Sequence, residues 1–563
     1  MAFRASSSGS ASNTMVWPNN DADHLLVSSA AMASLEESLF ASGLPVEALM
    51  EKAALAVSRQ LLHRHGARLR RDGAVVLVGP GHNGGDGLVV ARELHLAGIR
   101  TSLWSPFERH RPLTESHLRH ALWLGIPRLE QPPEPDGCEL WIDALLGLAQ
   151  QRRPGEAIEA LLAARQQQRP GQLVAVDVPT GLCSDSGRPT GDAAATASST
   201  CCIGLIKTGL LQDAALPWVG ELVRLDLGLP PALLGSLPGS TTRILWPEDR
   251  STAPWPQLAA HLGKYGRGRL LLVAGSPRYP GAAALAVAGA NASGCGCVRA
   301  ALPPEVAKGL WHQSPHVLLD PPLPAAADGS SRLTELTLSG DDRLDAVVLG
   351  PGLGRGRDDA ADAAISREDE GLWDRLQAFQ GLVVLDADGL NRLADRDGAG
   401  WLGGRQGPTW ITPHGHEFQR LFPDLSGRPA LEAAAIAAER CQAAVLLKGA
   451  RSVVAAPDGQ TWQLGQADAR SARTGLGDVL AGYAAGCGAR AVAALGGSAG
   501  DRSGDGPAPL GRSLAPLLAA AALDHACAGI AASRLNGNAT TPMAVAAQLA
   551  DAEIKTQQNQ DML

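Results

Sequence analysis

Carboxylate and amide side chains stand among glycines at several points of this sequence, in patterns that could bind and activate a small polar substrate. The stretch GPGHNGGDG (79–87) follows the apolar run AVVLV and carries Asn83 and Asp86. Its glycines fit the G-x-G-x-x-G pattern of a dinucleotide-binding loop. That pattern also needs an acidic residue at the end of the next strand, about 20 residues on, to bind a ribose hydroxyl. No carboxylate stands directly after IRTSLW, so a redox-cofactor loop is disfavoured and a plain structural turn stays open.

Two further acidic residues end predicted strands in the first half. Asp143 lies in WIDALLG and Asp177 in VAVDVPTG. The carboxyl ends of parallel strands meet at one crevice, so we expect these two and Asp86 to face a common ligand. Lys207 in IKTGL strengthens this expectation, although a single Asp at a strand end is more often a turn or cap residue. Only six of the 49 Lys and Arg residues are Lys, and either chance or a need for a compact ammonium explains those that remain.

In the second half the stretch GLGDVLAG could open a helix whose free N–H groups point at an anion. Asp478, directly after Gly477, would then accept the proton of a hydroxyl during phosphoryl transfer. We expect the helix N-terminus to keep Asp478 ionised. A helix with a glycine-rich N-terminus and no chemistry is the alternative. GPGLGRG, DADGLN, TPHGHEF and KGARSV each follow a predicted strand in this half, which favours a site.

Length and composition set the broad class. The 563 residues suit two large α/β domains, and a net charge of −8 with a pI near 6.0 gives no basic stripe, so no nucleic-acid partner is expected. Nine cysteines without a C-x-x-C pair suggest reduced side chains. No apolar segment of a secretory signal stands at the N-terminus, and we expect a cytoplasmic protein. The uncharged run 281–298 is predicted to be a buried helix and turn, with no membrane partner.

Strand-like and helix-like segments alternate through both halves, which predicts parallel sheets covered by helices. A helical region, 31–65, comes first. The predicted strands of the first half are GAVVLVG, IRTSLW, LWIDALLG, LVAVDVP, STCCIGL and ELVRLDLGL. Those of the second half are GRLLLVAGS, CVRAALP, AVVLGPG, LVVLDADG, TWITPHG and AAVLLKGA, before Ala-rich helices. A Pro- and Gly-rich segment places the domain boundary near residue 240, and 496–511 is predicted to be a flexible surface insertion.

The motifs are together similar to those of one enzyme family. GPGHNGGDG, DALLG, DVPTG and IKTGL, then GSPRYPGAA, GPGLG, DADGLN, TPHGHEF, KGA and GLGDVLAG, resemble in kind and order the bifunctional NAD(P)H-hydrate repair enzymes of the YjeF/Nnr family. The likeness covers nearly the whole chain. It implies an N-terminal Rossmann-like three-layer sandwich, residues 15–240, with NAD(P)HX epimerase activity, followed by a ribokinase-like α/β domain, residues 241–555, with NAD(P)HX dehydratase activity.

The resemblance also implies substrates and cofactors. The substrates would be NADHX and NADPHX, hydrated forms of the reduced cofactors. The first domain would epimerise their R and S forms. The second would dehydrate the S form back to NAD(P)H, with ADP or ATP as co-substrate, magnesium, and AMP and phosphate as products when ADP is the donor. Potassium would serve the epimerase, and a homo-oligomer is expected.

Site residues follow by motif. In the epimerase, the resemblance implies substrate contacts from His82, Asn83, Gly84, Gly85, Asp86, Gly147, Leu148, Ala149, Asp177 and Lys207, with Asp177 as the acid–base group. It implies potassium ligands at Asn83, Asp143 and Thr180. In the dehydratase, Ala282, Gly352, Gly354, His414 and Asp478 would contact the hydrate, with Asp478 as catalytic base. The nucleotide would lie at Lys448, Gly449, Ala450, Arg451, Ser452, Gly475 and Gly477.

The sequence departs from the family pattern at a few positions. His82 replaces the usual Asn, Thr180 the usual Ser, and Gly-Leu-Ala at 147–149 the usual Gly-Thr-Gly. Leu476 stands where a small residue is common, and we expect its side chain to point away while its N–H still donates to the anion. Two rival interpretations remain: a binding scaffold in the first half, as in RNA-decapping scaffold proteins, and a vitamin or sugar kinase in the second.

Overall fold

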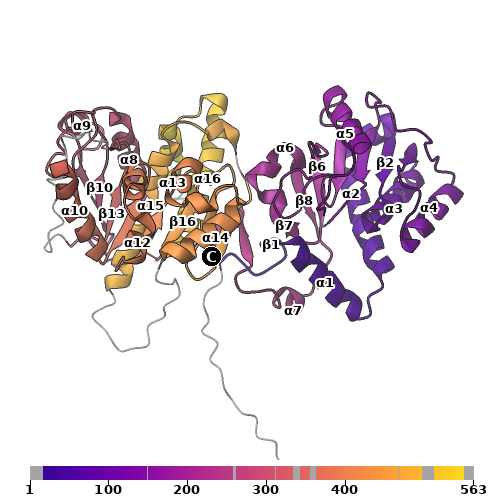
Figure 1. Ribbon diagram of the computed structural model, residues 1–563, viewed down its shortest axis with the longest axis horizontal. Helices are drawn as coiled ribbons and strands as arrows, with labels where there is room; N and C mark the ends of the chain where they lie inside the picture. Colours follow the sequence, from indigo (N-terminus) through magenta and orange to yellow (C-terminus); the bar gives the residue numbers. More distant parts are fainter. Residues whose placement is uncertain are drawn as a thin grey trace, which may run out of the picture. The chain divides into compact units, whose positions relative to one another are not determined.

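The computed structural model describes residues 17–148, 150–257, 261–310, 312–333, 336, 343–355, 363–466, 468–497 and 513–550. The chain divides into two compact units. The N-terminal unit is Asn20–Ile244, and the C-terminal unit begins at Leu245 and includes Trp17–Asn19. Figure 1 shows the first in indigo to magenta and the second in rose to yellow. Trp17 belongs with the second unit because its indole donates to the Asp249 carbonyl and its own carbonyl accepts from Trp462.

A parallel sheet forms the centre of the N-terminal unit. Among the described residues it has six strands in the order β3-β2-β4-β5-β6-β8. The strands are β2 (Ala74–Val78), β3 (Thr101–Trp104), β4 (Leu140–Ala144), β5 (Leu173–Val176), β6 (Ser199–Ile203) and β8 (Glu221–Leu225). All neighbouring pairs are parallel. These six strands confirm the six segments predicted for this half.

Helices cover both faces of this sheet, which explains why its central strands are mostly apolar. They are α1 (Ser29–Ala41), α2 (Val46–Asp72), α3 (His82–Leu96), α4 (Pro112–Trp123), α5 (Glu156–Gln168), α6 (Leu216–Val219) and α7 (Pro231–Leu234). Val76 and Ile142 pack in one cluster with residues of α2 and α3. Their strand neighbours Val75 and Trp141 pack on the opposite face with residues of α5. The Rossmann-like three-layer sandwich is confirmed.

Several short elements outside the six-stranded sheet were not predicted from the sequence. The strand β1 (Leu25–Val27) pairs in parallel with β7 (Ile206–Lys207) and antiparallel with β9 (Thr242–Leu245). Two 3-10 turns follow β7, Thr208–Leu211 and Asp213–Ala215. Each of these strands is too short to show a period of two in the sequence.

The sheet of the C-terminal unit runs in the order β12-β11-β10-β13-β14-β15-β16-β17-β18 within the described residues. Its strands are β10 (Arg269–Val273), β11 (Cys297–Ala301), β12 (Leu318–Leu319), β13 (Ala346–Leu349), β14 (Leu382–Leu385), β15 (Thr409–Ile411), β16 (Ala444–Leu447), β17 (Val453–Ala455) and β18 (Thr461–Leu464). Pairing is parallel from β12 to β16 and antiparallel from β16 to β18. The six strands predicted here are confirmed, while β12, β17 and β18 were not predicted.

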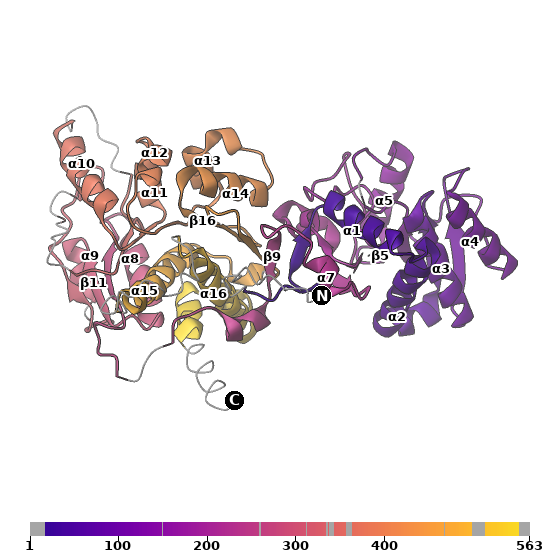
Figure 2. The ribbon, with the colours of Figure 1, turned by 90° about the horizontal axis from the view of Figure 1, so that it is seen from below.

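Helices lie on both faces of this sheet as well. They are α8 (Pro280–Ala292), α9 (Pro304–Leu310), α10 (Ala363–Ala378), α11 (Asp388–Ala394), α12 (Gly398–Gly403), α13 (Gly415–Leu421), α14 (Ala430–Cys441), α15 (Leu476–Gly497) and α16 (Ala515–Asn536). Short 3-10 turns occur at Pro247–Thr252, Pro423–Leu425, Ala469–Ser471 and Gly537–Ala539. Figure 2 shows α13 and α14 on one side of β16 and α15 and α16 on the other.

The helices α8 and α15 pack unusually closely, backbone to backbone. A Cβ at Gly289 would lie 2.1 Å from the Val479 carbonyl oxygen, and one at Gly482 would lie 1.9 Å from that of Ala286. The run 281–298 is therefore a buried helix followed by a turn, as predicted. The helices α15 and α16 are long and apolar enough to cross a membrane, but most of each apolar stretch is buried inside the protein, as is usual for core helices. Most of the predicted insertion, 498–511, lies outside the described residues.

Candidate active sites

The glycines of GPGHNGGDG are required by close backbone packing. A Cβ at Gly79 would lie 1.6 Å from the Leu145 carbonyl oxygen, and one at Gly84 would lie 2.0 Å from that of Gly79. One at Gly87 would lie 2.4 Å from the Ala144 Cβ. The loop thus packs directly on the end of β4. The N-cap of α3 is Gly81, without a side-chain cap, so the N–H groups of the first turn are available to an anion.

Asp143 and Thr180 form a fully buried polar pair beneath this loop. The Thr180 N–H donates to Asp143 Oδ2 at 2.8 Å, and its hydroxyl donates to Oδ1 at 2.7 Å. Burial raises the pKa of Asp143 to about 6, although the bonds from Thr180 and from the Leu145 N–H oppose the shift. Thr180 Oγ1 also accepts from the Leu146 N–H at 3.1 Å. The pair therefore joins the ends of β4 and β5.

The Asn83 amide lies beside Gly147 and has no partner among the described residues. Its oxygen and nitrogen are both buried and form no hydrogen bond in this part of the chain, which is costly for an amide unless a ligand satisfies it. A Cβ at Gly147 would lie 3.0 Å from the Asn83 Cβ and 3.3 Å from its Oδ1. A side chain at position 147 would therefore crowd the Asn83 amide. The Leu148 side chain packs against the apolar core, and Ala149 lies outside the described residues.

An ion pair between Asp177 and Lys207 forms the second polar cluster of this unit. Asp177 has a positive φ of 67°, in a region that Asp and Asn tolerate better than most residues. Its Oδ1 accepts from Lys207 Nζ and, at 3.1 Å, from the Ile203 N–H. Burial alone would lower the pKa of Lys207, but the charge of Asp177, the Cys202 thiol, the hydrogen bond to Asp177 and the charge of Glu36 together outweigh it, and the net shift is upward. One carboxylate oxygen of Asp177 is thus fixed by the protein, and Oδ2 is left for a ligand.

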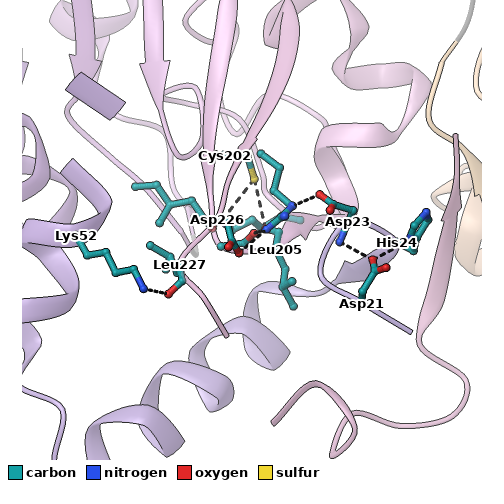
Figure 3. Close-up of polar contacts among 12 residues, drawn as sticks. Asp21, Asp23, His24, Lys52, Cys202, Leu205, Asp226 and Leu227 are labelled. Carbon is teal, nitrogen blue, oxygen red and sulfur yellow. Dashed lines mark hydrogen bonds and ion pairs between the residues drawn. The ribbon is translucent and has the colours of Figure 1, made fainter. Parts of the chain in front are cut away.

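A pocket of about 70 Å³ opens beside this pair. Its lining residues include Glu36, Phe40 and Met50 from the first two helices, His82 and Asp86 from α3, and Ile203 and Leu227. Figure 3 shows Lys52, on α2, reaching the Leu227 carbonyl, at 2.6 Å. Burial is the main cause that raises the pKa of Asp86 well above its usual range.

The expectation that three carboxylates face one ligand stays a prediction. Asp86 lies in α3 and lines the pocket, and its pKa responds to the charge of Asp177. Asp143 lies inside β4, where it is fully buried and bonded to Thr180. Neither Asp143 nor Asp177 is among the residues that line the pocket. Glu36 was not predicted, because it stands on a helix 43 residues before the first residue of GPGHNGGDG, Gly79, and carries no pattern of its own.

A second lysine–aspartate pair, between the partly buried Lys448 and the buried Asp386, marks the C-terminal unit. Lys448 Nζ donates to Asp386 Oδ1 at 2.6 Å, and the Thr412 hydroxyl donates to the same oxygen at 2.8 Å. The Lys448 N–H donates to the Pro413 carbonyl at 2.9 Å. Burial opposes the charge of Lys448, but Asp386 and then Glu417 raise its pKa. Asp386 stands in DADGLN, a motif noted in the sequence, but its pairing with Lys448 was not predicted.

His414 and Glu417 lie beside this pair at the start of α13. The His414 N–H donates to Glu417 Oε2 at 2.9 Å, and His414 Nε2 lies 3.2 Å from Oε1. Burial raises the pKa of Glu417 to about 7. The half-exposed His414 ring is thereby held toward solvent beside Lys448, where a ligand can reach it. Sequence analysis missed Glu417 because a capping residue three positions after an N-cap predicts only a helix start.

Asp478 faces the same cluster from α15. Burial, and then the charge of Asp386, raise the pKa of Asp478 to about 7. The expectation that the helix N-terminus keeps this group ionised is wrong, because desolvation and neighbouring carboxylates outweigh the helix dipole. No hydrogen bond joins the Asp478 carboxylate to another described residue, so it is not a helix cap. A group with a pKa near 7 is suited to proton transfer at neutral pH.

The backbone before Asp478 partly matches the predicted anion site. The Leu476 side chain packs against the core, as expected, but its N–H donates to the Arg473 carbonyl. The prediction that this N–H binds the anion is therefore wrong. The N–H groups of Gly477 and Asp478 remain, since Val479 bonds the Gly475 carbonyl. A Cβ at Gly477 would lie 3.3 Å from Lys448 Nζ, so the turn and the lysine share one site.

The glycines of GPGLG form a tight turn after β13. Gly352 and Gly354 have positive φ values of 65° and 77°, and a Cβ at Gly352 would lie 2.5 Å from that of Ala282. The predicted hydrate-site residues Ala282 and Gly352 are therefore adjacent. The buried Arg392 side chain donates to the Gly354 carbonyl at 2.9 Å and fixes the turn. The predicted nucleotide segment Gly449–Ser452 is itself a turn, closed by the Ser452 hydroxyl.

Comparisons with known proteins match both units. A family model described as "YjeF-related protein N-terminus" matches residues 46–209, and one described as "NAD(P)H-hydrate dehydratase" matches residues 270–554. A Synechocystis bifunctional NAD(P)H-hydrate repair enzyme Nnr is 39% identical, covering 90% of this chain and 91% of that protein. The Gloeobacter violaceus enzyme of the same name is 42% identical over 81% of this chain and 87% of its own.

Solved structures are also similar to part of the chain. One is the ADP/ATP-dependent NAD(P)H-hydrate dehydratase from Bacillus subtilis, co-crystallised with ATP and Mg²⁺. It is 24% identical, with a TM-score of 0.42, and the match covers 55% of this chain and 97% of that one.

Removing the Lys207 ammonium from its buried pair with Asp177 should lower the free energy of unfolding much more than removing a surface charge. Lys207→Met leaves Asp177 buried without its cation, and a loss of about 3–5 kcal/mol is expected. Arg64→Met is the matched control in the same unit, because Arg64 pairs with Glu221 on the surface, and such pairs contribute at most about 1 kcal/mol. Urea unfolding of both variants measures the difference. Equal midpoints would show that the Lys207 pair does not organise this unit.

Proposed function

The chain belongs to the family of bifunctional NAD(P)H-hydrate repair enzymes, and we propose that each unit performs one of the two repair reactions. The N-terminal unit interconverts the R and S hydrates of NADH and NADPH. The C-terminal unit dehydrates the S hydrate with the help of a nucleotide. One observation carries this proposal: each unit has its own lysine–aspartate ion pair at the carboxyl ends of parallel strands, Lys207–Asp177 and Lys448–Asp386.

In the N-terminal unit the substrate pyrophosphate would bind at the N-terminus of α3, where backbone N–H groups of residues 82–84 lack a side-chain cap. The hydrated ring would then lie toward the pocket, between Asp86 and the Asp177–Lys207 pair. Asp177 is the acid–base group of this proposal. Its Oδ1 is engaged by the protein, so its other oxygen is the one that exchanges a proton with the substrate.

A potassium ion fits the cluster of oxygen atoms from Asn83, Asp143 and Thr180. The amide oxygen of Asn83 has no partner in the described part of the chain, and Asp143 is a carboxylate whose pKa burial raises. Both, together with the Thr180 hydroxyl, offer the oxygen ligands that alkali and alkaline-earth cations prefer. A bound potassium ion would supply positive charge that keeps Asp143 ionised and orients the substrate loop. Asn83, Asp143 and Thr180 are the residues that would hold it.

In the C-terminal unit Asp478 is the proposed base. It accepts the proton of the ring hydroxyl while that oxygen attacks the terminal phosphoryl group of the nucleotide. Lys448 and the N–H groups of Gly477 and Asp478 stabilise the negative charge that develops on the phosphoryl oxygens. The ring then loses phosphate as the leaving group and a proton from the adjacent carbon, and NAD(P)H is restored. His414 and Ala282 lie where they can contact the ring.

The nucleotide would lie along the turn 448–452, next to Gly475 and Gly477. With ADP as donor the products are AMP and phosphate. Magnesium would enter with the nucleotide phosphates, because the described residues form no cluster of three acidic, histidine or cysteine side chains that could hold a metal alone. ADP or ATP as donor, a homo-oligomer and a cytoplasmic location stay predictions.

Two isosteric substitutions should separate the activities. Asp478→Asn is expected to slow dehydration of the S hydrate by about two to four orders of magnitude, with nucleotide affinity nearly intact, because only the proton acceptor is lost. In the wild type this rate should fall as the pH drops below about 7, where Asp478 becomes protonated. Asp177→Asn should slow epimerisation by about a hundredfold or more and tolerate the positive φ at this position.

Each variant is the control for the other, since each should retain the activity of the other unit. Chromatographic separation of the R and S hydrates and recovery of reduced nicotinamide measure the two rates. Near-normal dehydration by a folded Asp478→Asn protein would contradict the proposed phosphoryl-transfer step. Normal epimerisation by Asp177→Asn would move the acid–base role to another carboxyl group, with Asp86 examined first.

Potassium binding should stabilise the N-terminal unit. At a concentration one hundred times the dissociation constant, a ligand adds about 2.7 kcal/mol, and each kcal/mol raises the melting temperature of a unit of this size by about 2–4 °C. Thermal unfolding in potassium chloride and in choline chloride of equal ionic strength measures this. Asn83→Ala should abolish the difference, because its amide has no other partner to lose. An equal shift in both salts would speak against the site.

A further inference from the structure

Glu36 is a carboxyl group of the pocket that none of the motifs supplies. It lies on α1, outside the segment 46–209 that the N-terminal family model matches. Building on the proposed epimerase function, we propose that Glu36 is a second catalytic acid–base group that shares the proton transfers with Asp177. The two carboxyl groups come from different elements, Glu36 from α1 and Asp177 from the end of β5, and both lie against the wall that contains Ile203.

The position of α1 is fixed by contacts with the catalytic strands. β1 pairs with β7 so that Val27 lies beside Lys207, and α1 begins two residues later. The Ser29 N–H and hydroxyl donate to the Asp185 carboxylate at 2.6 and 2.5 Å, and Asp185 stands in the loop that follows Asp177. The helix that carries Glu36 is therefore tied to the partner lysine of Asp177 and to the loop behind it.

Glu36 lies on the buried face of this helix. Met32, one turn earlier, is fully buried, and its methyl group lies 2.8 Å from the place of a Cβ at Gly204. Residues four apart share one face of a helix, and Glu36 accordingly lines the pocket with Phe40, four positions on. No hydrogen bond or ion pair joins the Glu36 carboxyl to any described residue. A structural role would leave this partly buried acid unexplained, whereas a substrate hydroxyl or water would satisfy it.

The charges around Glu36 suit proton exchange. Burial, followed by the charge of Asp177, raises the pKa of Glu36 to about 6, and Lys207 partly opposes this. The other titratable groups that face the pocket are His82 and Asp86 on α3. Burial raises the pKa of Asp86 well above its usual range, and the charges of Asp177 and Glu36 add to this shift. Glu36 can gain or lose a proton near neutral pH.

Inversion at the hydroxyl-bearing ring carbon needs two proton transfers. One carboxyl group gives a proton to the hydroxyl, the C–O bond breaks, and water leaves with the bonding pair while the ring nitrogen lone pair forms a C=N⁺ bond. A water molecule then adds to the other face of the ring, and its electron pair forms the new C–O bond. The second carboxylate takes the proton of this water. Glu36 and Asp177 exchange protonation states in each turnover, and reaction in the opposite direction or exchange with solvent restores them.

The test compares Glu36→Gln with Glu37→Gln in the full-length protein. Glu37 is the next residue on the same helix but is exposed, so its substitution should leave the rate unchanged. Glu36→Gln should slow epimerisation about a hundredfold, remove the limb of the pH–rate profile near pH 6, and slow ¹⁸O uptake from labelled water into the hydroxyl group equally. Glu36→Asp should keep part of the rate and the pH limb, which separates chemistry from a folding defect. Dehydration of the S hydrate should stay unchanged in all three.

Outcomes for the two proposals differ. If Glu36→Gln epimerises at the wild-type rate with an unchanged pH profile while Asp177→Asn does not epimerise, the role of Glu36 is refuted and the epimerase function stands. If the wild-type protein does not interconvert the hydrates, both are refuted. Epimerisation without ¹⁸O uptake would also refute the proposal, because the C–O bond would then never break.

Discussion

Each unit of this protein is organised by a lysine ammonium that pairs with a buried aspartate at the end of a parallel strand. Such a pair is stable only if both charges stay together and the surrounding groups satisfy their remaining hydrogen bonds. The Lys207 ammonium donates hydrogen bonds to the Asp177 carboxylate and to the Ile203 carbonyl. The Lys448 ammonium donates to the Asp386 carboxylate, which also accepts a hydrogen bond from the Thr412 hydroxyl. The strand ends are consequently held in one arrangement, and the groups that face the substrate are positioned by the same contacts.

The pairs also set the charge of the acids around them. In each unit the lysine is already matched by one carboxylate, so additional buried acids are only partly compensated. Burial therefore raises the pKa values of Glu36 and Asp86 in the first unit and of Glu417 and Asp478 in the second. Both sites thus contain carboxyl groups that can hold or accept a proton near neutral pH. A binding scaffold would need neither the buried ammonium nor these acids, which favours catalysis in the N-terminal unit.

The parts of this arrangement that depend on local sequence patterns could be predicted from the sequence. All central strands were predicted from apolar runs, and Asp177, Lys207, Lys448 and Asp478 from the motifs that follow them. Glu36, Glu417 and Arg392 were missed, because their roles depend on neighbours brought close only by the fold. The protonation of Asp478 was predicted wrongly, since its burial beside Asp386 is a tertiary property. The glycine loop shows the same limit: its pattern suggested a cofactor loop, whereas Gly79 and Gly84 are required by backbone contacts with Leu145 and with each other.

The most direct test of two cooperating sites is the extent of repair of a mixture of R and S hydrates by the full-length protein. The hydrates are incubated with ADP or ATP and magnesium, and reduced nicotinamide is followed by its absorbance at about 340 nm. We expect all of the mixture to return as NAD(P)H, at a rate faster than spontaneous epimerisation. Recovery that stops at the S share would contradict the epimerase site, and no recovery with either nucleotide would contradict the account of both units.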